Sequence, residues 1–175
     1  MSDIKSTGFG VAIAFVAPGV VAVWGAGQFS PTVARWFGAT SKAPASGAGF
    51  LFVVLASLAA GITLSGLRHT LIVRVLSWRG IKRAQGLDES KTQSADCRAA
   101  LAQAVEDFFR YHQFYGNMSL AVLLAYVGHL SAKHLNPFKD LGLLTLVIVG
   151  ILSLVVSSGH SLKRYYEVEA QLLSP

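Results

Sequence analysis

The sequence predicts an all-α membrane protein with four transmembrane helices and a cytoplasmic helical hairpin formed by extensions of helices 2 and 3. Three observations support this fold class. The chain of 175 residues is 53% hydrophobic and only 14% charged, whereas soluble domains average about 25% charged residues. The apolar residues form four long uncharged blocks, and none of these alternates strictly between apolar and polar positions. Because lipid admits only helices and closed barrels, blocks without such alternation favour helices.

The four apolar blocks have roughly the lengths that transmembrane helices need. A hydrocarbon core about 30 Å thick is crossed by about 20 helical residues. The third block is shorter, but Phe114 to Asn117 can extend it through the headgroup region. The first block follows Lys5 like a signal peptide, yet its run of about 20 residues exceeds the usual core, so we expect it to be retained. The blocks cover residues 8–28, 49–67, 118–130 and 141–159.

Lys and Arg residues predict the orientation of these spans. Eleven of the fifteen lie in the N-terminus, in the loop between the second and third blocks, or in the C-terminus. Because cytoplasmic loops carry the excess of positive charge, we expect both termini and the middle loop on the cytoplasmic side of a bacterial inner membrane. The chain then divides into helices 1 and 2 (8–67), a basic cytoplasmic hairpin (68–115), helices 3 and 4 (116–160) and a cytoplasmic tail (161–175).

The downstream arm of this hairpin is predicted to be one helix that continues into the membrane. Ser94 or Asp96 can cap a helix that begins near Cys97. The residues that share one face of it are Leu101, Val105, Phe108, His112 and Tyr115. No breaker follows, so a helix over 97–129 would be about 50 Å long and would lie partly in cytosol and partly in lipid.

The upstream arm is expected to extend the second span past the membrane edge as a helix in the same way. Two stiff arms would couple a cytoplasmic signal to the spans. The alternative is a static hairpin that only solubilises the inner face.

Small residues recur along one face of the second span. Ser57, Gly61 and Ser65 are spaced by four positions, and Arg68 continues the line. Such stripes usually allow close helix packing. A pore wall is the other interpretation, because small hydroxyl and glycine positions leave room for water and Arg68 would form a charged ring at the inner mouth.

The first arm of the hairpin carries the candidate ligand-binding residues, and no acidic residue interrupts them. Basic residues beside a membrane usually contact anionic lipid headgroups, each gaining about 1 kcal/mol. The alternative ligand is a nucleotide or short single-stranded DNA, with an indole ring stacked on a base. The candidates are Arg74, Trp78, Arg79, Lys82 and Arg83.

Catalytic motifs are absent from the sequence. It contains no HExxH, no GxSxG and no phosphate-binding lysine loop, and no Asp or Glu lies within an apolar block. We therefore expect neither an enzyme nor a proton-coupled carrier, and no metal or cofactor. His69, His112 and His160 fall near one membrane edge and provide the alternative, a site that binds a metal or haem or senses pH.

The order of two spans, a basic hairpin and two further spans, with RYHQFYGNM opening the third span, resembles a family of small bacterial membrane effectors. This is the channel-forming component of Hailong-type anti-phage defence. In that family a nucleotidyltransferase makes short DNA oligomers that control the channel. The resemblance implies a channel that depolarises the infected cell and an oligonucleotide on the basic arms, and it assigns no individual residue.

Four spans with few polar positions do not enclose an aqueous path alone, so we expect a closed homo-oligomer, most simply a tetramer, with any pore on its symmetry axis. The leading hypothesis is an oligomeric ion channel effector controlled by an anionic cytoplasmic ligand. The alternative is a non-conducting scaffold or accessory subunit that presents its hairpin to a protein partner.

Overall fold

The computed structural model describes residues 10, 12–36, 47–133, 138 and 140–174. Within these ranges the chain is almost entirely helical and contains no strand. The α-helices are α2 (Ala17–Phe29), α3 (Pro31–Trp36), α4 (Gly47–Trp78), α5 (Ala95–Ala104), α6 (Arg110–Ala132) and α7 (Leu141–Leu173). Two π-helical turns, η1 (Ala12–Val16) and η3 (Val105–Phe109), precede α2 and α6, and a 3₁₀ turn, η2 (Glu89–Gln93), precedes α5.

Three helices of the described chain are long and apolar enough to cross a membrane. They cover Ala12–Phe29, Phe50–Trp78 and Leu141–Leu173, where the first, second and fourth spans were expected. The expected third span lies in α6, which carries more polar side chains. His112, Asn117 and Ser119 are nevertheless buried, so these three polar side chains of α6 lie inside the protein.

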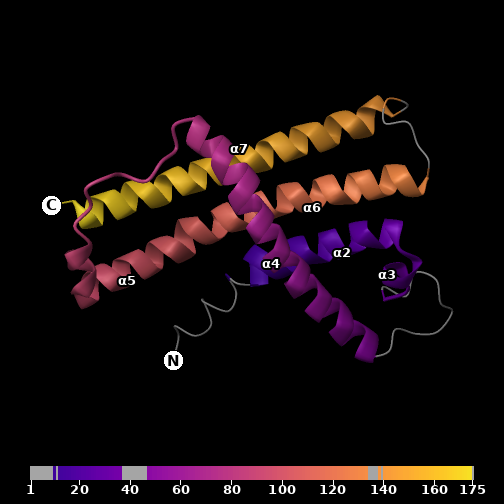
Figure 1. Ribbon diagram of the computed structural model, residues 1–175, viewed down its shortest axis with the longest axis horizontal. Helices are drawn as coiled ribbons and strands as arrows, with labels where there is room; N and C mark the ends of the chain where they lie inside the picture. The colour runs from indigo at the N-terminus through magenta and orange to yellow at the C-terminus, as the bar shows by residue number, and fades with distance from the viewer. Residues whose placement is uncertain (1–9, 11, 37–46, 134–137, 139, 175) are drawn as a thin grey trace.

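Helix α6 lies between α2 and α7, and α4 crosses this layer at a steep angle (Figure 1). Glycines set the spacing between α2 and α6. A Cβ on Gly25 would lie 2.7 Å from the Ala125 Cα, and one on Gly128 would lie 2.6 Å from the Gly25 carbonyl oxygen. Small residues at helix interfaces let backbones approach this closely in lipid.

The crossing of α4 over the first span depends on two further glycines. A Cβ on Gly19 would lie 1.7 Å from the Ser57 carbonyl oxygen, and one on Gly61 would lie 2.0 Å from the Phe15 carbonyl oxygen. Neither oxygen belongs to a flexible side chain that could move aside. The contact therefore requires glycine at both positions.

Helix α4 extends the second span to Trp78, as expected for the upstream arm, and ends there. Gly80 adopts a positive φ of 84°. Its N–H donates to the Ser77 carbonyl oxygen at 3.1 Å, and the Ile81 N–H donates to the Leu76 carbonyl oxygen at 3.0 Å. These two bonds form a Schellman motif, the usual helix terminator at glycine. Ile81 also packs against the core residue Leu76, as such motifs favour.

The downstream arm is helical from Ala95 to Ala132 through α5, η3 and α6. Its cap is Ser94, whose Oγ accepts from the Cys97 N–H at 3.1 Å. The π-helical turn η3 widens one turn and so shifts which side chains share a face before and after it. The helix nevertheless continues through the residues at the expected membrane edge. Helix α5 packs against α7 rather than against an extension of α4.

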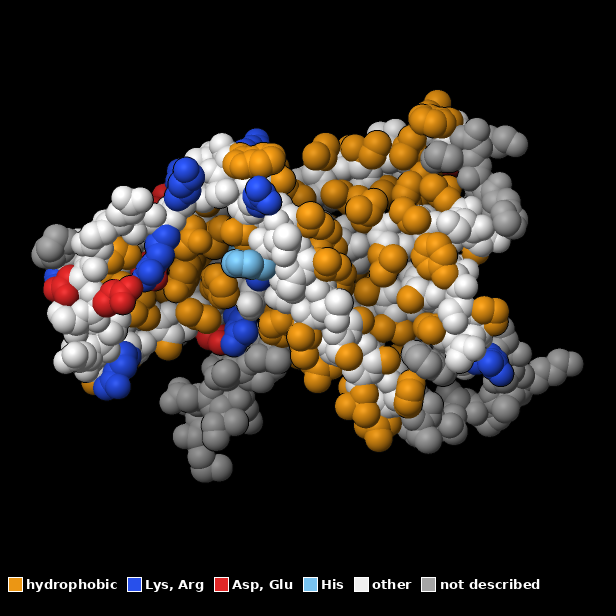
Figure 2. All heavy atoms as spheres, in the orientation of Figure 1, with side chains coloured by type: hydrophobic (Ala, Val, Ile, Leu, Met, Phe, Trp, Pro, Cys, Tyr) orange, Lys and Arg blue, Asp and Glu red, His pale blue; other side chains and the backbone are white. Residues whose placement is uncertain are grey.

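Helix α7 runs without a break to Leu173, so residues 161–173 of the expected tail are helical. At 1.5 Å per residue its 33 residues measure about 50 Å, well beyond a bilayer core of about 30 Å. Figure 2 shows the Asp and Glu and nearly all of the visible Lys and Arg side chains in the half of the molecule that holds α5 and the end of α7, and mostly hydrophobic side chains over the other half. One end of the molecule thus suits water and the other suits lipid.

Candidate functional site

The chain between α4 and η2 forms a strap, residues 79–88, that lies against the C-terminal part of α7. The Asp88 N–H donates to the Leu173 carbonyl oxygen at 2.8 Å. Arg83 Nη2 lies 2.9 Å from Glu169 Oε1, and its Nη1 lies 3.5 Å from Glu89 Oε1. The hydrogen bond and the charge of Glu169 raise the pKa of Arg83 above its usual range. Arg83 therefore fastens the strap to α7.

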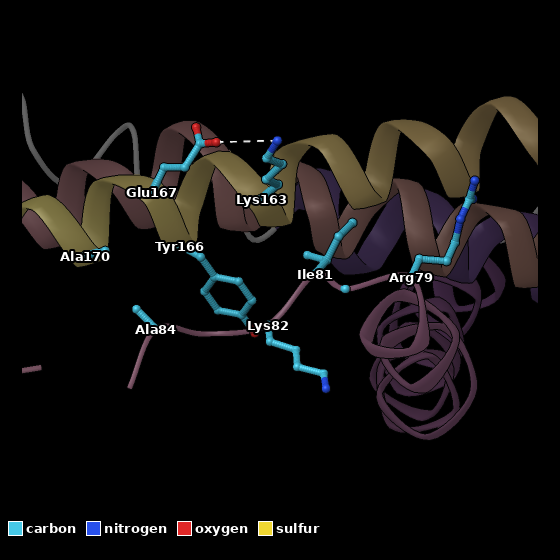
Figure 3. A pocket seen from close by; sticks show the side chains of 9 residues that line it. Arg79, Ile81, Lys82, Ala84, Lys163, Tyr166, Glu167 and Ala170 are labelled. Carbon is cyan, nitrogen blue, oxygen red and sulfur yellow. Dashed lines mark ion pairs between the residues drawn. The ribbon is translucent and has the colours of Figure 1, made fainter. Parts of the chain in front are cut away.

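The strap and α7 together line a pocket of about 380 Å³. Two cations come from the strap, Arg79 and Lys82, and a third, Lys163, comes from α7. Tyr166 points from α7 toward the strap, whereas Lys163 and Glu167 leave α7 on its other side in this view (Figure 3). The Lys163–Glu167 pair is exposed, with its charged atoms 3.8 Å apart, so the lysine is only weakly held.

The other three candidate ligand residues lie outside this pocket lining: Arg83, which pairs with Glu169, and Arg74 and Trp78. The Arg74 guanidinium carbon lies 6.0 Å from the centre of the Trp78 ring, and both side chains are exposed. The structure thus brings together Arg79 and Lys82 of the five predicted residues. It adds Lys163 and Tyr166, which sequence reasoning missed because residues 161–175 were interpreted as a tail.

A second polar cluster is buried where α4, α6 and α7 meet. Arg68 is 5% exposed, and His112 and Ser158 are fully buried. Arg68 Nη1 lies 2.5 Å from His112 Nε2. Because a guanidinium only donates hydrogen bonds, Nε2 must be the acceptor and the imidazole must be neutral, with its proton on Nδ1. This Nδ1–H faces the Ser158 carbonyl oxygen at 3.0 Å.

The cluster is closed by Ser158, whose hydroxyl lies 3.1 Å from the His112 carbonyl oxygen and donates to it. The Arg68 stem fits over Gly116, where a Cβ would lie 2.5 Å from the Arg68 Cδ. Arg68 Nη2 donates to Ser65 Oγ at 3.4 Å, and Arg68 Nε has no hydrogen-bond partner. In the described residues, no ion pair joins Arg68 to a carboxylate.

The small-residue stripe of α4 faces the inside of the protomer. Ser57, Gly61 and Arg68 are buried, and Ser65 is half-buried. Gly61 and Ser57 contact the first span through backbone atoms. These contacts place the stripe in helix packing within one chain.

The opposite face of α4 carries a second stripe that sequence reasoning missed. Ala59, Thr63, Gly66 and Thr70 follow heptad spacing and are all exposed. Thr63 Oγ1 donates to the Ala59 carbonyl oxygen at 3.0 Å, and Thr70 Oγ1 donates to the Gly66 carbonyl oxygen at 3.2 Å. Each hydroxyl donates its hydrogen bond within its own helix, and its oxygen keeps lone pairs that can accept from outside. We call these four residues the outward stripe.

The three histidines near the membrane edge occupy different environments. His112 is buried, whereas His69 and His160 are exposed. Across the described positions, no group of three or more His, Cys, Asp or Glu side chains is arranged to hold a metal ion. No protein-family model, curated protein or solved structure matches this chain.

Proposed function

We propose that the protein is a homo-oligomeric ion channel of the bacterial cytoplasmic membrane, controlled by an anionic ligand that binds between the strap and α7. One observation carries this proposal. The wall of the basic pocket and a candidate membrane span belong to the same unbroken helix, α7. A ligand in the pocket therefore contacts an element that continues into the bilayer.

The strap gives the ligand a second connection, to α4. Gly80 and Ile81 of the strap terminate α4 directly through the Schellman bonds. An anion held by Arg79, Lys82 and Lys163 would pull the strap toward α7. Because the strap continues directly from α4, this pull would act on the C-terminal end of α4. Charge-assisted hydrogen bonds to phosphate are stronger than neutral ones, which suits this task.

The outward stripe supports a pore between copies of the chain. Small residues and threonine are enriched where membrane helices pack together, and hydroxyl oxygens can also line a water-filled pore. Helix α4 crosses its own bundle and its N-terminal half projects away from it (Figure 1). Phe50, Leu51 and Phe52 are exposed on that half. We propose a closed ring, most simply a tetramer, in which the outward stripes face the axis.

The remaining topology is part of the same proposal. Helix α6 would form the third of four spans, and both termini and the strap would lie in the cytoplasm. Opening would depolarise the membrane, as the resemblance to anti-phage effectors implies, and short single-stranded DNA or a nucleotide would be the ligand.

Binding in neutral detergent tests the ligand step without anionic lipid. We expect a short single-stranded DNA or a nucleotide to bind the purified protein and to lose at least tenfold in affinity in the Arg79→Glu/Lys82→Glu variant. Arg74→Glu is the matched control, because it reverses a nearby exposed charge outside the pocket lining and should change affinity much less. Equal losses in both variants would mean general electrostatic attraction, and no binding together with no ion flux would favour the scaffold.

A further inference from the structure

We propose that Arg68 and His112 form a proton-sensitive latch that holds α4 against α6 and α7 while His112 is neutral and releases Arg68 when His112 is protonated. The latch depends on the packing of one chain and does not require that the protein conduct ions. It would give α4 a second input besides the ligand pocket.

The chemistry of the latch depends on a single lone pair. His112 Nε2 is the only hydrogen-bond acceptor on the imidazole, since Nδ1 carries the proton that faces Ser158. A proton taken from water would form a new Nε2–H bond and remove this acceptor. The Arg68 guanidinium and the His112 imidazolium would then face each other as two cations that both only donate. No change of tautomer could restore a hydrogen bond between them.

Among the residues that the structure describes, no negative charge beside the pair would offset two positive charges. The titratable or charged groups near the pair are His69, from α4, and Tyr166, from α7. Neither is a carboxylate, and the hydroxyl of Ser158 is already bonded to the His112 backbone. Like charges repel more strongly in a protein interior than in water, because the interior screens them less. The side chain that can leave is Arg68.

Few hydrogen bonds hold the Arg68 side chain in place. Its stem lies in the notch at Gly116, and its Nε lacks a partner, so few bonds hold the side chain besides the one to His112. Leaving the notch would separate α4 from α6 at the level where α7 also joins them. Because Arg68 shares α4 with the outward stripe, the same movement would turn or tilt that stripe.

Spin-label distances between α4 and α7 test the latch directly. Labels at Thr70→Cys and Ser153→Cys, both exposed positions, are introduced in a Cys97→Ser background and diluted with unlabelled protein so that pairs within one chain dominate. Double electron–electron resonance is recorded in neutral detergent between pH 8 and about 3.5, because burial and the Arg68 charge lower the pKa of His112 to about 4. We expect the parent protein to gain a population with a changed distance as the pH falls.

Three variants separate the latch from a general effect of acid. His112→Gln keeps an acceptor for Arg68 and a donor for Ser158 at every pH, so its distance should stay constant. Arg68→Gln removes the repelling charge and should also stay constant. His69→Gln is the matched control and should respond like the parent. A constant distance in the parent, or an unchanged response in either His112→Gln or Arg68→Gln, would overturn the proposal.

Discussion

Arg83 and Glu169 are 86 positions apart in the chain, yet their side chains form an ion pair of 2.9 Å that ties the strap to α7. The Glu169 side chain is only 9% exposed, whereas Arg83 is about half exposed. Removing Arg83 would leave a nearly buried carboxylate without its cation. The pair is therefore worth more than an ordinary surface ion pair.

For Arg83→Ala we expect the strap to open more easily by about 1–2 kcal/mol, because a charge-assisted hydrogen bond to a buried group is lost. Amide hydrogen exchange over residues 79–88 measures this local opening. Arg164→Ala is the control, since its partner Glu167 is exposed, and the expected change is below about 0.5 kcal/mol. Equal effects of the two substitutions would show that Arg83 does not hold the strap.

Acid should loosen the strap through Asp88. The hydroxyl and the N–H of Ser90 donate to its carboxylate at 2.6 and 3.0 Å and hold the pKa of Asp88 below its usual range. A lowered folded-state pKa stabilises the fold above the unfolded value of about 3.9 and loses this effect as pH falls through the folded value. Exchange over η2 should rise in that window for the parent and stay flat for Asp88→Asn, beyond the intrinsic pH dependence of exchange.

This acid window borders on the one that tests the His112 latch, but exchange is read over η2 and the latch is read from a distance between α4 and α7. The two effects are also in different parts of the molecule, so the two measurements do not confuse one with the other.

Adding one methyl group at Gly61 should destabilise the protein. The new Cβ would meet the Phe15 carbonyl oxygen at 2.0 Å, and helices forced apart in this way lose about 1–3 kcal/mol. Gly66→Ala is the matched control on the same helix, because nothing lies within 4 Å of its Cβ position. Alanine there should be neutral or stabilise by up to about 1 kcal/mol. Thermal unfolding in one detergent compares the two, and a stable Gly61→Ala variant would contradict the packing described here.

The outward stripe predicts where a pore blocker acts. In a Cys97→Ser background, a positively charged thiol reagent should reduce ion flux through Thr70→Cys at least severalfold. Leu71→Cys presents an exposed neighbouring position that is off the stripe, and its flux should stay within about twofold of the untreated protein. Block at Leu71→Cys without block at Thr70→Cys would place the pore elsewhere.

Features set by local chemistry were predictable from the sequence. Ser94 caps α5 as one of two expected caps, and Glu106 pairs with Arg110 at 3.3 Å. The end of α4 has an equally local signal in Gly80, two residues after Trp78. Residues 162, 166, 169 and 173 likewise follow helical spacing, which would have extended the last helix into the expected tail.

The buried cluster could not be predicted, because it depends on how three helices are rotated about their axes. Sequence placed His112 and Arg68 near one membrane edge but not in contact. The packing of Gly116 against the Arg68 stem is one of the contacts that fix this rotation. The same reason explains why the sequence left two interpretations open for Ser57, Gly61 and Ser65. Their spacing does not say whether this face of α4 turns toward its own chain or toward a pore.

The most direct test of the proposed function is the ionic current across a neutral lipid bilayer that contains the purified protein. The proposal predicts discrete current steps whose open time changes when short single-stranded DNA or a nucleotide is added on the strap side, and no such change in Arg79→Glu/Lys82→Glu. A bilayer that carries correctly assembled protein and passes no current, with or without these ligands, would contradict it.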